Sequence, residues 1–157
     1  MVRMAAVVAL SIAGLASSPR WTATLGPQGD SKVTGTATVE AAASSMADTA
    51  KMKDMDHSKM AGTKVWISVK GLDGTGQHAW HMHRGTCAAV GAVVGTDSSY
   101  PVLQPGADGS AEGTASLSMA APTSGSYLVA VHSGPTGESS TISCGELRAG
   151  GAGNSGN

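Results

Sequence analysis

Residues 64–83 read Lys64-Val-Trp-Ile-Ser-Val-Lys70-Gly-Leu-Asp-Gly-Thr-Gly76-Gln-His-Ala-Trp-His-Met-His83. The first seven residues are rich in strand-forming side chains, and a turn-rich connection separates them from a second strand over residues 78–83. Outward from this stretch, further short segments show the two-residue period of a β-strand, at Trp21–Leu25, Val33–Val39, Gly113–Ser118, Tyr127–His132 and Thr141–Leu147. Short strands at this spacing predict an all-β fold, an antiparallel sandwich or barrel.

The composition indicates one small domain of an exported protein. A chain of 157 residues can bury a core, and a net charge of −1 gives no electrostatic reason to bind nucleic acid or an anionic membrane. Arg3 followed by an apolar run resembles a signal peptide over residues 1–16, cleaved after Ala16, although a core helix or strand is the alternative. We therefore expect a domain over residues 17–148, a disordered tail over 149–157, no membrane segment after cleavage, and a periplasmic or secreted location.

The sequence contains two cysteines, Cys87 and Cys144. An even cysteine count in an exported chain favours one disulfide, and two free thiols are the alternative.

Three of the five histidines fall at positions where they could share a metal ion. His81 and His83 are two residues apart on a predicted strand, so both side chains leave the same face, while Trp80 and His78 point to the opposite face and the core. His132 ends another strand, where a third ligand could meet the first two. Two solvated histidines on an exposed face are the alternative. Because metal–nitrogen bonds are about 2 Å long, a shared ion requires imidazole nitrogens within about 4 Å of one another.

A Met-rich loop covers residues 41–62 and contains Met52-Lys-Asp-Met-Asp-His-Ser-Lys-Met60. Thioether sulfur is a soft ligand that selects Cu(I), so Met52, Met55, His57 and Met60 are candidates for an accessory copper site. An ordinary exposed loop, or methionines that pack on the barrel, are the alternatives.

The segment Gly76-Gln-His-Ala-Trp-His-Met-His83 resembles the Gly-x-His-Gly-Phe-His-x-His strand of the copper/zinc superoxide dismutases. Other segments are similar to motifs of that family in the same order, at Trp21–Leu25, Val33-Thr-Gly35, Val65–Leu72, Asp108-Gly-Ser-Ala111, Val129-Ala-Val-His132 and Ser143-Cys-Gly-Glu-Leu147. The resemblance covers Trp21 to Leu147. It implies a Greek-key β-barrel or sandwich of about eight antiparallel strands.

Carried over residue by residue, the resemblance implies one copper site with His81, His83 and His132 as ligands. It implies that His78 braces the ligand strand by hydrogen bonding and that Cys87 and Cys144 form the disulfide.

The chain departs from the family pattern around this site. No histidine follows Cys87 over residues 88–95, and residues 93–103 offer only Asp97 as a zinc ligand, so no zinc is expected. Thr141 stands where the family has an arginine that guides superoxide. The connection Ser133–Ser143 is much shorter than in the family, and we expect it to leave the copper open to solvent.

These observations predict an exported, copper-binding, superoxide dismutase-like protein for copper buffering, delivery or tolerance, with a copper donor or acceptor protein as its partner. The second candidate is a copper-only superoxide dismutase that converts superoxide to oxygen and hydrogen peroxide. The third is a metal-free, disulfide-bonded interaction module. No residue is assigned a catalytic role.

Overall fold

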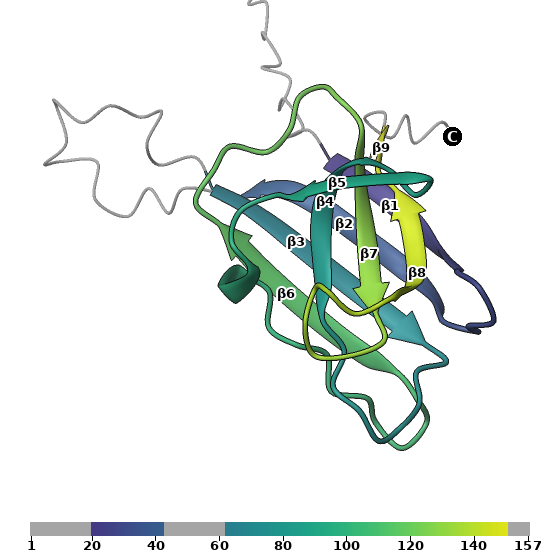
Figure 1. The fold of residues 1–157 in the computed structure, drawn as a ribbon. Coiled ribbons are helices and arrows are strands. Elements are labelled where there is room, and N and C mark those ends of the chain that lie inside the picture. Colours follow the sequence, from purple (N-terminus) through teal and green to yellow (C-terminus); the bar gives the residue numbers. More distant parts are fainter. Residues whose placement is uncertain (1–19, 43–61, 151–157) are drawn as a thin grey trace, which may run out of the picture.

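The computed structural model describes residues 20–42 and 62–150 (Figure 1). These residues form nine β-strands and a short 3₁₀ helix, which are β1 (Arg20–Pro27), β2 (Thr34–Ala42), β3 (Gly62–Lys70), β4 (Trp80–Thr86), β5 (Ala89–Val93), η2 (Asp97–Ser99), β6 (Ala111–Leu117), β7 (Tyr127–His132), β8 (Thr141–Glu146) and β9 (Arg148–Gly150). All strand pairings are antiparallel. The predicted all-β barrel or sandwich is confirmed.

The strands form one curled sheet in the order β5-β4-β7-β8-β1-β2-β3-β6, and β9 also pairs with β1. Three pairs of neighbours in this order, β3–β6, β4–β7 and β8–β1, are not consecutive in the chain, and the connections after β3, β5 and β6 cross between the two parts of the sheet. Such crossings produce a Greek-key arrangement. In Figure 1, β4 and β7 lie in front of β2 and β3, and the main core fills the space between them.

The main core follows from the two-residue period of the strands. In β3 the side chains of Val65, Ile67 and Val69 are buried, while their neighbours in sequence point outward. Trp80 of β4 lies fully buried in the same core and its indole Nε1 donates a hydrogen bond to the Pro101 carbonyl oxygen (2.8 Å). The large ring fits because Gly113 of β6 has no side chain, since a Cβ there would come within 2.9 Å of Trp80 Nε1.

The strands β4 and β7 are buried on both faces, unlike β3. Every residue of β7 is buried, and so are both histidines of β4. Behind β7, the side chains of Leu128, Ala130 and Cys144 form a second, smaller apolar cluster against which Cys87 packs. The outer face of β4 and β7 is therefore also an interior, and the histidines point into it.

The predicted disulfide between Cys87 and Cys144 is confirmed. It joins the turn between β4 and β5 to β8, with a Cα–Cα distance of 5.9 Å. The bond therefore fixes the β4–β5 hairpin at one end of the histidine-bearing face.

Two predicted boundaries are corrected by the structure. The strand expected to begin at His78 begins at Trp80, and His78 forms an isolated bridge with Leu103. Ala149 and Gly150, expected in the disordered tail, pair with β1 as part of β9. The tail prediction was drawn from the Gly-rich composition and the terminal position of this segment, whereas backbone pairing with β1 keeps residues 149 and 150 in the sheet.

Several predictions fall outside the described residues. They concern the signal peptide over residues 1–16, the tail residues 151–157, and residues 43–61 of the Met-rich loop, with Met52, Met55, His57 and Met60. The predicted ends of that loop are wrong, because Ala41 and Ala42 belong to β2 and Gly62 belongs to β3. Within residues 20–42 and 62–150, no helix is long and apolar enough to span a membrane.

Candidate metal centre

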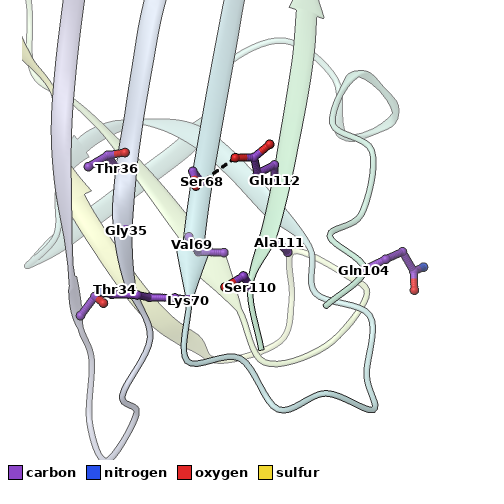
Figure 2. Close-up of a pocket in the computed structure, with 10 residues that line it drawn as sticks. All are labelled: Thr34, Gly35, Thr36, Ser68, Val69, Lys70, Gln104, Ser110, Ala111 and Glu112. Atoms are coloured by element: carbon purple, nitrogen blue, oxygen red, sulfur yellow. Dashed lines mark hydrogen bonds between the residues drawn. The ribbon is translucent and has the colours of Figure 1, made fainter. Parts of the chain in front are cut away.

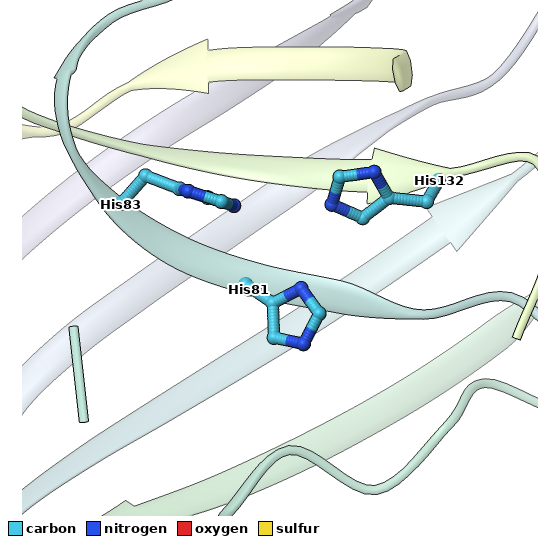
Figure 3. Close-up of side chains that lie close together, drawn as sticks. All are labelled: His81, His83 and His132. Atoms are coloured by element: carbon cyan, nitrogen blue, oxygen red, sulfur yellow. The ribbon is translucent and has the colours of Figure 1, made fainter. Parts of the chain in front are cut away.

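Three histidines converge on one point between β4 and β7, and we refer to His81, His83 and His132 as the histidine trio (Figure 3). Strand geometry explains the convergence. His81 and His83 leave the same face of β4, and they stand opposite Ala130 and Leu128 of β7. His132 lies two residues beyond Ala130 on that same face, so its ring meets the other two from the end of β7.

Each ring of the histidine trio has one buried nitrogen that lacks a hydrogen-bond partner. These atoms are His81 Nδ1, His83 Nε2 and His132 Nε2. The three side chains are nearly closed to solvent, with exposed fractions of 3%, 6% and 3%. Buried polar atoms in proteins are normally paired, because leaving one unpaired costs about 1–3 kcal/mol. A single metal ion could satisfy all three of these atoms.

Backbone carbonyls orient two of the rings. His83 Nδ1 donates to the Gly91 carbonyl oxygen (3.0 Å), and His132 Nδ1 donates to the Ser139 carbonyl oxygen (2.9 Å). A carbonyl oxygen only accepts, so these Nδ1 atoms carry the hydrogen and leave a lone pair on each Nε2. This is the arrangement that metal-binding histidines commonly have, with the second ring nitrogen fixed by an acceptor.

His81 is oriented differently. Its Nε2 atom faces Asp97 Oδ1 of η2 at 3.9 Å, and the free nitrogen is Nδ1. The Tyr100 ring packs edge-to-face against the His81 ring, with centroids 5.2 Å apart. The Tyr100 hydroxyl donates to the Val94 carbonyl oxygen (2.6 Å), which fixes this neighbour in place.

Burial favours the uncharged form of His81 and His132. Burial and the neighbouring His132 lower the pKa of His81 to about 4, and burial also lowers the pKa of His132. A metal ion binds the neutral imidazole, so His81 and His132 are held in their ligating form.

The spacing of the nitrogens suits a metal ion after a small movement. The ligand atoms lie within 4.8 Å of one another, whereas bonds of about 2 Å place two nitrogens at most about 4 Å apart. Even if two of the nitrogens are 4.8 Å apart, ring rotations that move each nitrogen by less than about 1 Å bring them within this limit. The histidine trio could therefore hold a metal ion, as the sequence predicted.

His78 lies behind the trio. It is buried, its Nδ1 atom is 2.9 Å from the His132 carbonyl oxygen, and its Nε2 atom is 3.2 Å from Asp73 Oδ1. The ring therefore supports the backbone of His132, on β7, rather than the strand that follows it in sequence.

The connection between β7 and β8 covers the site. We call residues 133–140 the site loop. It is tied down at both ends, since the Gly134 carbonyl oxygen accepts from the Ala79 amide (2.7 Å) and the Ser139 carbonyl oxygen accepts from His132. Gly137 lies against the His81 ring so closely that a Cβ would be 2.9 Å from Cε1 and 3.3 Å from Nδ1. The expectation of an open site is thus wrong, because a short loop here lies flat on the histidines.

An open surface hollow lies elsewhere on the described part of the chain. It is an open, polar depression of about 650 Å³ between β2, β3 and β6, and it contains none of the trio (Figure 2). In it Ser68 Oγ donates to Glu112 Oε1 at 3.4 Å, and its lining has this one acidic side chain and no histidine or cysteine. The candidate metal site is therefore identified by its unpaired buried nitrogens and not by the volume of a surface hollow.

Sequence reasoning found the trio but missed its partners. Gly91 and Ser139 orient the rings through their backbone carbonyls, and Gly137 makes room for His81 because it has no side chain. Residue type does not reveal any of these roles in the sequence. Asp97 was considered only as an isolated carboxylate in a region without zinc ligands.

Comparison with known proteins adds no family assignment. No family model matches the chain, and no curated protein matches it.

Proposed function

We propose that this chain is an exported copper-binding protein of the copper/zinc superoxide dismutase type, which buffers or delivers copper or confers copper tolerance. The observation that carries the proposal is the set of three buried, unpaired nitrogens, one on each ring of the histidine trio. The resemblance of residues 76–83 and 129–132 to the family's ligand segments supports the same function.

The chemistry of the ligand set favours copper. Imidazole suits copper, and copper stands at the top of the affinity order of divalent first-row metals. Three neutral imidazoles can hold Cu(I) in a trigonal arrangement, and none of them has to lose a proton. When bound, copper would supply one-electron redox chemistry, while the chain's own residues hold the ligand rings and exclude water.

The Met-rich loop is proposed as an accessory Cu(I) site. Met52, Met55, His57 and Met60 lie within nine residues of sequence, so a short segment could wrap one ion. Exchange between a thioether site and the histidine trio would suit a protein that receives copper or passes it on.

The proposed location is the periplasm or the cell exterior. A disulfide joins Cys87 and Cys144, and such bonds persist in oxidising compartments.

Copper binding is tested by metal analysis and Cu(II) electron paramagnetic resonance of the purified full chain. We expect one copper per chain at the main site under conditions that exclude weak binding, with nitrogen coupling. His83→Ala should lose this copper, whereas Gln104→Ala, an exposed side chain in the hollow that contains none of the trio, should retain it. Equal retention in both variants would overturn the assignment. Absence of copper from the wild-type chain after reconstitution would leave only the interaction-module alternative.

A dismutase assay separates buffering from catalysis. The site loop closes the histidines off from solvent and the family's guiding arginine is replaced by Thr141, so we expect a rate no higher than that of copper bound to an unrelated protein. A rate well above that control would favour the copper-only superoxide dismutase.

A further inference from the structure

Each trio ring has a second nitrogen besides its unpaired one, and among the described residues Asp97 is the one side chain that faces such a nitrogen. Its Oδ1 atom is 3.9 Å from His81 Nε2, and its side chain is 77% exposed. The corresponding nitrogens of His83 and His132 are held at 3.0 and 2.9 Å by backbone carbonyls. His81 thus differs from its partners, because its orienting group is a charged and movable carboxylate.

The direction of the His81 ring determines what Asp97 can do. The buried, unpaired atom of this ring is Nδ1, which faces the other two free nitrogens. If Nδ1 binds the ion, Nε2 must carry the ring hydrogen, since a neutral imidazole has one N–H group. The Asp97 carboxylate lies on the side of this N–H group, and an ionised carboxylate is a hydrogen-bond acceptor and never a donor.

We infer that Asp97 is the positioning residue of His81, accepting its Nε2 hydrogen and so directing Nδ1 at the copper. The inference rests on the proposed copper-binding function. A distance of 3.9 Å is about 1 Å longer than a hydrogen bond, and rotation of an exposed side chain closes such a gap. Binding of an ion to Nδ1 strengthens the contact, because it makes the Nε2 hydrogen more acidic.

The contact also affects the oxidation state of copper. A carboxylate bound to a ligand imidazole makes the ring a stronger electron donor, and its negative charge stabilises the more highly charged ion. The other two rings have neutral acceptors, so Asp97 is the negative contact of the trio within the described residues. Asp97 therefore favours Cu(II) over Cu(I).

Asp73 provides a matched control. Its side chain is 78% exposed and its Oδ1 atom is 3.2 Å from His78 Nε2, so Asp73→Asn removes the same charge at the same exposure. The hydrogen bond from His78 to the trio goes to the backbone carbonyl of His132 and not to a ligand ring. If the copper affinities depended only on the loss of one negative charge, both variants would change alike. If they depend on the contact with the ligand His81, only Asp97→Asn changes them.

The experiment measures Cu(I) and Cu(II) affinities of the full chain by chelator competition, together with the reduction potential. We expect Asp97→Asn to weaken Cu(II) binding about tenfold more than Cu(I) binding, which corresponds to a potential about 59 mV higher. Asp97→Glu should restore most of the difference, and Asp73→Asn should match the wild type. Asp97→Asn and Asp73→Asn variants with equal potentials would overturn the inference while leaving copper binding intact.

A metal-free measurement gives a second readout. In the apo protein, nitrogen-15 chemical shifts of the His81 ring report which nitrogen carries the hydrogen. We expect Nε2–H in the wild type and a shift toward Nδ1–H in Asp97→Ala. A wild-type ring with its hydrogen on Nδ1 would refute the positioning role. A wild-type chain with Nε2–H that binds no copper would instead refute the proposed function.

Discussion

Removal of the disulfide, by the double substitution Cys87→Ala and Cys144→Ala, should lower the free energy of unfolding substantially. The two cysteines are 57 residues apart, and closing a loop of that length lowers the entropy of the unfolded chain. In the chain-entropy model this stabilises the folded state by about 4 kcal/mol. Cys144 is also buried beside Leu128 and Ala130, so loss of its sulfur adds a small packing cost.

The same substitution should weaken copper binding. Gly91, whose carbonyl oxygen holds the His83 ring, lies four residues beyond Cys87 in the hairpin that the disulfide fixes to β8. Equilibrium urea unfolding of the double variant should show this loss of stability relative to the wild type, and chelator competition should show weaker copper binding. A loss below about 1 kcal/mol, or unchanged copper affinity, would refute the reasoning that the disulfide supports this face.

Three further outcomes are expected. Since the folded-state pKa of His81 is near 4, below the ordinary 6.5, the unfolded state binds more protons between these values, and the metal-free protein should lose up to about 3 kcal/mol as pH falls through that window. Urea unfolding at several pH values measures the slope, which His81→Ala should reduce. Gly137→Ala should weaken copper binding, because its Cβ would lie 2.9 Å from His81 Cε1, while Gly26→Ala, which has open space, should not; chelator competition compares them. Trp80→Phe should cost about 3 kcal/mol in urea unfolding, because it leaves a cavity and an unpaired Pro101 carbonyl oxygen; a cost below about 1 kcal/mol would contradict the packing described.

The two-residue period carried most of the strand prediction. Tyr127–His132 was predicted with the bounds that the structure has, because an apolar strand with a polar end is unambiguous. Ala89–Val93 was missed as a strand, since its five residues are small or apolar, show no alternation and lie mainly exposed at the sheet edge. Periodicity also could not show that β7 is buried on both faces, because the second cover comes from distant segments.

The histidine trio was predictable for a geometric reason. Side chains two apart on a strand share a face, which placed His81 and His83 together, and His132 followed from its position at a strand end. Their orientation was not predictable. It depends on carbonyl groups of Gly91 and Ser139, which every residue type possesses, and on loop conformations that place those groups near a ring.

The closed site loop has a consequence for the rate of metal exchange. Gly134 and Ser139 anchor the loop, and Gly137 lies on the His81 ring, so an ion could leave only after these contacts break. The residence time of copper would then be set by how often the loop opens and not by the strength of the metal–nitrogen bonds. A chelator in large excess would remove the ion at a rate that no longer rises with chelator concentration, and that plateau would equal the opening rate of the loop.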